Sequence, residues 1–198
     1  MASGRASISA SRAGLKPVCG SASLQCLPRI AATNISCSIP AWCAPTSRPP
    51  PEKGGQALGR SRGGLTTKIH LLADTLGRPL RFILTAGQAN DLTQAPALLH
   101  GQTARRVIAD RGYDSNAVRQ LIAEIGAKAV IPSKCSRLVR IRHDVKAYRL
   151  RNRIERCFNR LKHFRRIATR YDRRDLHFLA ALHLVGALQW LPANVDSA

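Results

Sequence analysis

The sequence predicts an α/β domain with one mixed sheet flanked by helices, preceded by a disordered amino-terminal segment. From residue 55 to residue 191, strand-like segments alternate with segments of helical periodicity, the order expected for a sheet covered by helices. Two of the strand-like segments are separated only by a short turn, which predicts an antiparallel hairpin. Residues 1–54 are basic, rich in Ser, Ala and Pro, and without a sustained period, so we expect this low-complexity segment to be disordered.

The domain begins with the hairpin and a short helix. Residues 66–74 and 80–85 have the composition of strands, and a Thr-Leu-Gly turn lies between them. Asp91 with Gln94 three residues later resembles a capping box and predicts a short helix at that point. We therefore interpret Asp91 as a helix cap.

Two further strands enclose a second helix. Residues 105–110 and 127–132 have strand character, and residues 115–125 have the apolar spacing of a helix, which Gly126 closes. Asp114 is interpreted as the N-cap of that helix. Functional side chains gather near the carboxyl ends of strands in such sheets, so the acid that ends the first of these two strands is a candidate site residue.

Residues 147–166 form a predicted helix with three different faces. An apolar stripe is expected to pack on the sheet, and it consists of Ala147, Leu150, Ile154, Cys157, Phe158, Leu161 and Phe164. A row at offsets 0, 3, 7 and 14 falls within an arc of about 60° at about 100° per residue, and it consists of Tyr148, Arg151, Glu155 and Lys162. A basic sector suits a polyanion, and it consists of Arg149, Arg153, Arg156, Arg160 and His163. The simpler interpretation is an ordinary amphipathic helix with an Arg–Glu pair worth a few tenths of a kcal/mol.

Asp110 and Glu155 are the candidate catalytic and metal-binding residues. Phosphodiester chemistry with Mg²⁺ needs carboxylates that converge on the ions, and each ion typically takes one or two carboxylates with substrate phosphates. Asp110 closes a strand, and Glu155 is the only acid within residues 147–166, a helix that can pack across the sheet and reach the same place. The alternative for Asp110 is a turn or cap residue, because Asp-Arg-Gly is turn-like.

The charge of the chain favours a polyanionic partner. The formal net charge is +21 in 198 residues, and sixteen Lys or Arg stand against three acids between Lys134 and Arg174. Such a charge attracts a phosphate backbone and makes binding salt-dependent, although a merely soluble basic surface is the alternative. No apolar segment is long enough to span a bilayer, and the six Cys lack the paired spacing of a zinc knuckle.

The row of Tyr148, Arg151, Glu155 and Lys162 resembles the signature of one group of insertion-sequence DDE transposases, in which these residue types are separated by two, three and six residues. The stretches GRSRGGLTTKIHLLAD, VIADRGYDS and IERCFNRLKHFRRIATRYD resemble the same family. The resemblance implies a ribonuclease-H-like fold, Mg²⁺ or Mn²⁺, and cut-and-paste chemistry on terminal inverted repeats and target DNA. It also implies that Asp110 and Glu155 are the second and third acids of the triad, with Tyr148, Arg151 and Lys162 on DNA phosphates.

The first acid implied by the resemblance is absent. Its strand should precede GRSRGG, yet residues 1–51 hold no Asp or Glu, and Glu52 lies in a Pro- and Gly-rich stretch. We therefore expect the first strand of the domain to be missing. Residues 34–53, back-translated with permitted codons and read two bases later, can give YLMLDSSMVRAHQQAATGK, which resembles that strand. One hypothesis is thus that the amino-terminal third is an out-of-frame translation, and a transit peptide is another interpretation of its Arg and Ser content.

The sequence therefore predicts a transposase of bacterial type, located in the cytoplasm with the nucleoid, as a frameshifted or partial copy with impaired strand transfer. Two other function classes stay open. One is a non-catalytic DNA-binding protein such as a transposition inhibitor. The other is a basic RNA-associated structural protein, although charge neutralisation alone does not require the aligned row on the helix. A homodimer is also left open.

Overall fold

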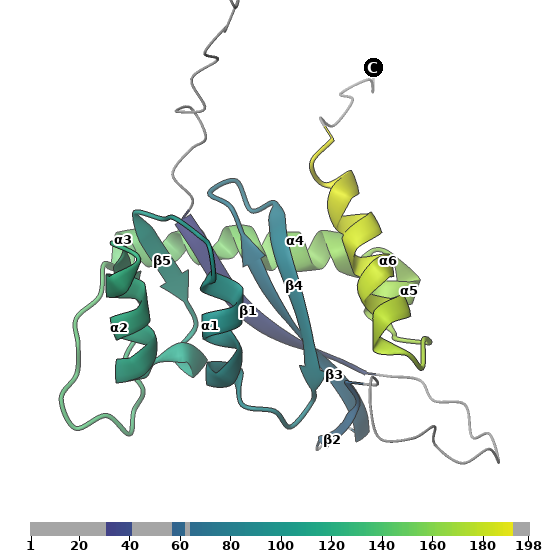
Figure 1. Cartoon of the computed structure of the whole chain (residues 1–198), viewed down its shortest axis with the longest axis horizontal. Helices are drawn as coiled ribbons and strands as arrows, with labels where there is room; N and C mark the ends of the chain where they lie inside the picture. The colour runs from purple at the N-terminus through teal and green to yellow at the C-terminus, as the bar shows by residue number, and fades with distance from the viewer. Residues whose placement is uncertain (1–30, 41–56, 62–63, 192–198) are drawn as a thin grey trace, which may run out of the picture.

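The computed structural model describes residues 31–40, 57–61 and 64–191, and for residues 31–40, 60 and 61 it describes the backbone alone. Six strands form one sheet (Figure 1): β1 Ala31–Pro40, β2 Gly59–Ser61, β3 Gly64–Ala73, β4 Pro79–Ala86, β5 Arg106–Ala109 and β6 Lys128–Val130. The α-helices are α1 Ala95–Leu99, α2 Asn116–Glu124, α3 Val145–Tyr148, α4 Asn152–Lys162, α5 Arg165–Ala168 and α6 Asp175–Leu188. Three 3₁₀ turns connect them: η2 Asp91–Gln94, η3 Arg111–Tyr113 and η4 Arg149–Arg151.

The sheet is mixed, as the sequence predicts. The strand order is β2-β3-β1-β5-β6, and β4 pairs with β3 off this path. β3 is antiparallel to β1, β2 and β4, whereas β5 is parallel to both β1 and β6. The predicted hairpin is therefore β3–β4, and the predicted third and fourth strands are β5 and β6.

Strand β1 corrects two expectations. Residues 31–40 lie inside the segment expected to be disordered, and they form a central strand in the place where the first strand was expected to be missing. Eight residues of β1 pair with β3 and four pair with β5, so the strand satisfies backbone groups along both neighbours. The alternation of Ile35, Cys37 and Ile39 with two serines is the strand signal in this stretch. The rest of the segment 1–54 lies outside the described residues.

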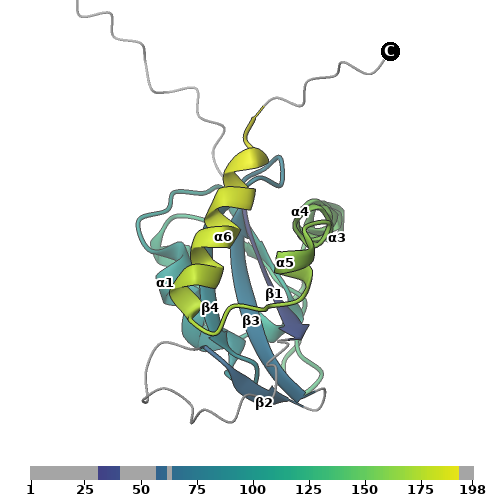
Figure 2. The same cartoon turned by 90° about the vertical axis from the view of Figure 1, so that its right-hand side faces the viewer.

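Helices cover both faces of the sheet, which Figure 2 shows edge-on. On one face, α4, α5 and α6 pack on β3 and β4 through side chains that include Ile69, Phe82, Ile154, Phe158 and Phe178. On the other face, α1 and α2 pack through a second cluster that includes Leu72, Leu98, Val107, Ile122 and Ile131. Among the described residues, no helix has the length and apolar character that crossing a membrane requires.

The turn of the β3–β4 hairpin is held by a buried carboxylate. Asp74 Oδ1 accepts from the backbone N–H groups of Leu76 at 2.9 Å and Arg78 at 2.8 Å, and its Oδ2 accepts from Arg78 Nε at 2.7 Å. Gly77 has φ +81°, and a Cβ at that position would lie 2.8 Å from the carbonyl oxygen of Arg153 on α4. The glycine therefore serves both the turn and the close approach of the helix.

Two expected helix caps are corrected. Asn90, not Asp91, caps η2, because its side chain accepts from the N–H of Leu92. Ser115, not Asp114, caps α2, because its Oγ accepts from the N–H of Val118 at 3.1 Å. In both cases the neighbouring aspartate is instead drawn to Lys or Arg side chains from other elements. None of these three partners could be found by local reasoning, because each is more than four residues away in the chain.

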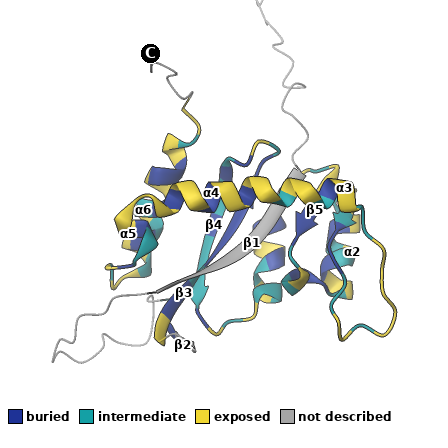
Figure 3. Ribbon diagram, turned by 180° about the vertical axis from the view of Figure 1, so that it is seen from behind, coloured by how far each residue is buried: buried dark blue, intermediate teal, exposed yellow. Residues whose placement is uncertain are grey.

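The helix predicted over residues 147–166 begins earlier and is divided. It runs as α3, the tighter turn η4 and α4, and Figure 3 shows it crossing one face of the sheet with an exposed outer surface. Its buried residues are Ala147, Ile154, Cys157, Phe158 and Leu161, so most of the predicted stripe is confirmed. Leu150 and Phe164 are exposed, because they lie at the edges of that stripe and near its ends.

Candidate functional site

Asp110 stands where β5 ends, on the first residue before η3. It occupies the N-cap position of that 3₁₀ turn, but its side chain makes no capping hydrogen bond. Its Oδ1 instead accepts from Arg151 Nη1 at 2.7 Å. The carboxylate of Asp110 therefore does not cap the turn but binds Arg151.

Arg151 joins the two candidate acids. Its Nη1 binds Asp110 and its Nη2 donates to Glu155 Oε1, each at 2.7 Å. The Tyr148 hydroxyl lies 3.5 Å from the same Asp110 oxygen, and the guanidinium carbon of Arg151 lies 5.5 Å from the centre of the Tyr148 ring. Residues forty-five positions apart in the chain thus meet at one guanidinium, because α4 crosses the sheet past the end of β5.

Asp110, Tyr148 and Arg151 border an open cleft of about 570 Å³. Its walls come from η2, the end of β5, η3, the segment after β6 and the start of the long helix, and its lining residues are Asp91, Asp110, Arg111, Gly112, Pro132, His143, Tyr148 and Arg151. The rings of His143 and Tyr148 meet edge to face with centres 5.4 Å apart. The cleft is therefore lined by acidic, basic and aromatic side chains.

Burial and charge act against each other on Asp110. Burial raises the pKa of its carboxyl, Arg151 lowers it through charge and a hydrogen bond, and nearby Glu155 raises it, with a net increase. Burial likewise raises the pKa of the Tyr148 phenol, so this group stays a neutral hydrogen-bond donor. Burial by itself would lower the pKa of Arg151, but the neighbouring carboxylates of Asp110 and Glu155 outweigh it, and the pKa is raised. A cation placed between the two carboxylates is thus favoured.

Asp91 is a cleft residue that the sequence reasoning assigned to a cap. Its Oδ1 accepts from Lys68 Nζ at 3.0 Å, and it lines the same cleft as Asp110. A Cβ on Gly112 would lie 3.2 Å from Asp91 Oδ2, so the absence of a side chain there leaves the carboxylate room. A sequence signal was present, because Asp91 follows the second strand of the hairpin closely, but the same residues fit a capping box equally well.

The donor set suits a divalent cation held partly by substrate. Asp110 and Glu155 each bind a different nitrogen of the Arg151 guanidinium, so both carboxylates lie beside the same cationic side chain. Within the described ranges, no group of three or more His, Cys, Asp or Glu side chains is placed to hold a metal ion. Two protein carboxylates fit an ion such as Mg²⁺, which completes its coordination with water and phosphate oxygens.

The remaining predicted DNA-contacting residues divide into two groups. The side chains of one group are exposed on the outer side of the helical segment that runs through α3, η4 and α4, and this group consists of Arg149, Arg156 and Lys162. Arg153 and Arg160 are also exposed, but Arg153 Nη1 donates to the carbonyl of Thr75 and Arg160 Nη2 donates to the carbonyl of Gly77 at 3.3 Å. Two of these five basic side chains therefore hydrogen-bond to the turn of the β3–β4 hairpin.

Comparison with known proteins adds a family likeness over the same residues. Residues 44–190 match the family described as "Transposase DDE domain". The chain is 39% identical over 129 residues to a protein of Brucella ovis named as a transposase for insertion sequence element IS6501, across 64% of this chain and 99% of that protein. It is 34% identical over 140 residues to a protein of Burkholderia cepacia named as a transposase for insertion sequence element IS402, of whose length it spans 63%. No solved structure matches the chain.

Proposed function

The chain belongs to the family of DDE-domain transposases, and from this we propose that it binds transposon-end DNA and cuts and joins DNA strands with Mg²⁺ or Mn²⁺. Its place of action is then the DNA of a bacterial cell, in the cytoplasm and at the nucleoid. The DNA it acts on comprises the terminal inverted repeats of the element and the target into which the element moves.

The observation that carries the proposal is the meeting of Asp110 and Glu155 at Arg151. Two carboxylates from distant parts of the chain converge on one cation at the carboxyl end of a strand, and the surrounding cleft is open to solvent. A general basic surface would not need this convergence, because charge neutralisation requires cations alone.

In the proposed mechanism, Asp110 and Glu155 would be the residues that hold a divalent ion, and such an ion would supply Lewis-acid activation for phosphodiester cleavage. Arg151 lies between the carboxylates and can turn its planar fork to a DNA phosphate, for which guanidinium geometry is suited. Tyr148 stays neutral and donates a hydrogen bond from the cleft wall. Arg149, Arg156 and Lys162 extend the phosphate-binding surface along the outer side of the helix.

We propose further that the sheet is ribonuclease-H-like. An antiparallel pair of strands leads into two parallel strands, helices lie on both faces, and the candidate acids gather at the carboxyl end of β5. This arrangement supports the fold implied by the transposase resemblance. It also explains why a helix far along the chain supplies one of the two acids.

The first acid of the expected triad is missing from the place where its strand should carry it. Strand β1 runs beside β5, and its residues AATNISCSIP contain no carboxylate. We therefore propose that strand transfer by this chain alone is poor or absent, because loss of one member of an interdependent set removes most of the rate. The out-of-frame hypothesis predicts that the coding DNA of residues 34–53 spells an Asp-bearing strand in the shifted frame. Native codons that spell no such strand would end that hypothesis.

The proposed function is tested by cleavage of oligonucleotide duplexes that carry the terminal repeats of the element, in Mg²⁺ and then in Mn²⁺. We expect weak, metal-dependent nicking that Asp110→Asn and Glu155→Gln each abolish while DNA binding persists. Glu124→Gln on α2 is the matched control, since Glu124 is an exposed glutamate outside the cleft. Nicking that survives both Asp110→Asn and Glu155→Gln would refute the assigned roles.

A second candidate function is a non-catalytic DNA-binding protein that inhibits transposition. The absence of a carboxylate from β1 favours it, because binding does not need the first acid. The same assay separates the two functions. Tight DNA binding without nicking in either metal, by the unaltered chain, would support the inhibitor and contradict the nuclease.

A further inference from the structure

The loop between β6 and α3 carries two exposed apolar side chains at its tip. Leu138 is fully exposed, at 101% of its reference area, and Val139 is 76% exposed. Single exposed apolar residues are ordinary on protein surfaces, but here two neighbours are both open to water at the tip of one loop. Basic residues flank them, namely Lys134, Arg137, Arg140 and Arg142.

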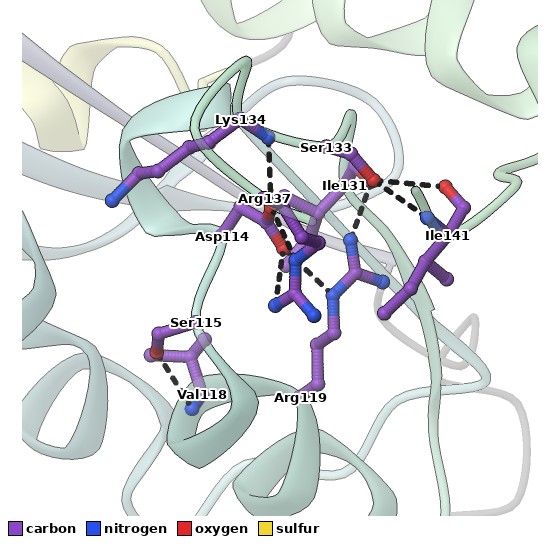
Figure 4. Close-up of polar contacts among 9 residues, drawn as sticks. All are labelled: Asp114, Ser115, Val118, Arg119, Ile131, Ser133, Lys134, Arg137 and Ile141. Atoms are coloured by element: carbon purple, nitrogen blue, oxygen red, sulfur yellow. Dashed lines mark hydrogen bonds and ion pairs between the residues drawn. The ribbon is translucent and has the colours of Figure 1, made fainter. Parts of the chain in front are cut away.

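A buried carboxylate gives this loop a defined shape (Figure 4). Asp114, whose side chain is fully buried, accepts from the backbone N–H of Lys134 at 2.8 Å and from Arg137 Nε at 3.1 Å. It also binds Arg119 Nε at 2.8 Å, and Arg119 in turn donates to the carbonyl of Ile131 just before the loop. The start of the loop is thus connected to α2 through Asp114 and Arg119.

The two ends of the loop are also joined to each other. Ser133 Oγ accepts from the backbone N–H of Ile141 at 2.9 Å and donates to the carbonyl of Ile141 at 3.0 Å. The tip between them therefore projects from a closed base. A loop whose base is closed in this way loses less backbone entropy when its tip binds a partner.

The loop stands at the edge of the candidate cleft. Pro132 and His143, which flank it, both line the cleft together with Asp110. Arg111, another cleft residue, has its Nη1 3.6 Å from Cys135 Sγ in the loop. DNA whose backbone reaches Asp110 therefore passes close to this loop.

We infer that Leu138 and Val139 form a wedge that enters the base stack of duplex DNA beside the cleft, while Arg140 and Arg142 hold the flanking phosphates. Apolar side chains on basic DNA-binding surfaces commonly unstack a base step and bend the duplex in this way. The inference rests on the proposed DNA-binding function and extends it to a distortion of the substrate. A second copy of the chain is a poorer occupant, since the surrounding Lys and Arg would face like charges.

The test uses the full chain and a short DNA duplex with 2-aminopurine placed at successive positions in separate samples. We expect binding to raise the fluorescence several-fold at one or two steps, because unstacking relieves the quenching of this base. A mismatch at the same step should tighten binding by about tenfold, since it removes part of the cost of unstacking. Anisotropy of a labelled duplex measures binding itself in parallel.

The decisive variant is Leu138→Ser with Val139→Ser, which replaces exposed side chains only. It should abolish the fluorescence rise and the preference for the mismatch while anisotropy still reports binding. The matched control is Leu176→Ser with Leu184→Ser on α6, whose side chains are 70% and 69% exposed and lie outside the cleft. This control should behave as the unaltered chain does.

The outcomes separate this inference from the proposed function. Binding by the unaltered chain without any fluorescence rise, or a rise that the tip variant retains, would overturn the wedge and leave DNA binding standing. A tip variant that changes only the sedimentation of the protein would assign the tip to a protein contact and overturn the wedge as well. No binding to any duplex would overturn both.

Discussion

At the scale of single residues, the guanidinium of Arg151 determines the charge state of the site. It stands between Asp110 and Glu155 and counteracts the burial that raises the pKa of Asp110. Without this cation, two carboxylates would lie close together in a partly buried position, which favours protonation of one of them. Arg151 therefore offsets part of the effect of burial on the pKa of Asp110.

This argument predicts how Asp110 titrates in a variant. In Arg151→Gln we expect the pKa of Asp110 to rise further above its ordinary value, because burial and Glu155 then act without the opposing cation. Arg151→Lys should shift it less, since the charge is kept while the forked geometry is lost. NMR detection of the labelled carboxyl carbon during a pH titration measures the effect. An Asp110 that titrates identically in the unaltered chain and in Arg151→Gln would contradict it.

Among single residues, Cys157 shows how burial makes a cysteine unsuitable as a nucleophile. It lies on the buried face of α4, and burial raises the pKa of its thiol to about 11. A thiol of this kind stays protonated near neutral pH and is a poor nucleophile. Its place on the apolar stripe was predictable from the periodicity of the helix, and the prediction that it is a core residue is confirmed.

At the scale of elements, Asp114 connects α2 to the loop that follows β6. Burial by itself would raise the pKa of its carboxyl, but the Lys134 N–H, Arg119 and Arg137 together hold the pKa below its ordinary value. The ion pairs are largely shielded, with Arg119 and Arg137 side chains 13% and 18% exposed. The Asp114 carboxylate thus links α2 to the loop after β6 through ion pairs and hydrogen bonds.

We therefore expect Asp114→Asn to lower the free energy of unfolding by about 3 kcal/mol, as is usual when one partner of a buried ion pair is removed. Asp172→Asn is the control, because its partner Arg166 is 63% exposed and the loss should stay below about 1 kcal/mol. Urea unfolding followed by circular dichroism measures both changes. Equal losses in the two variants would show that the Asp114 anchor is no stronger than a surface pair.

The effect of pH on the same variant has a definite sign. Since the folded-state pKa of Asp114 lies below the ordinary pKa of an aspartate, its stabilising contribution is present above that ordinary pKa and is lost as the pH falls through the folded pKa. The difference in stability between the unaltered chain and Asp114→Asn should accordingly be constant near neutral pH and shrink in acid. A difference that grows as the pH falls would have the wrong sign.

At the scale of the whole molecule, β1 holds the two halves of the sheet together. It lies between β3, which belongs to the hairpin, and β5, which carries the acid at its end. Among the described strands, the antiparallel and parallel parts are therefore linked through backbone pairing by β1 alone. The position of Asp110 relative to α4 depends on that link.

A chain that begins at residue 41 should consequently lose cooperative unfolding, because facing edges of β3 and β5 would be left without partners. A chain that begins at residue 31 keeps every described strand and is the control. Thermal unfolding monitored by circular dichroism and by amide NMR spectra distinguishes the two. If both chains melt in the same cooperative transition, β1 does not have the structural role assigned to it.

Much of the fold was predictable because it depends on local patterns. The hairpin, α2 with its closing Gly126, and the apolar stripe of α4 follow from alternation, periodicity and turn residues within short stretches. Strand β1 was missed since its short alternation lies within a polar, Pro- and Cys-containing region. Backbone pairing with two neighbouring strands places this segment in the sheet, and such pairing leaves little trace in composition.

The sequence by itself determined the kinds of elements, the basic charge and the two acids worth examining, since these depend on residue types and their spacing. Only the tertiary structure decided that Asp110 and Glu155 share Arg151, that Asp91 borders the same cleft, and that Asp114 anchors a loop rather than a helix. The physical reason is that an ion pair needs two groups within a few ångströms. Chain folding, and not spacing along the chain, brings such groups together.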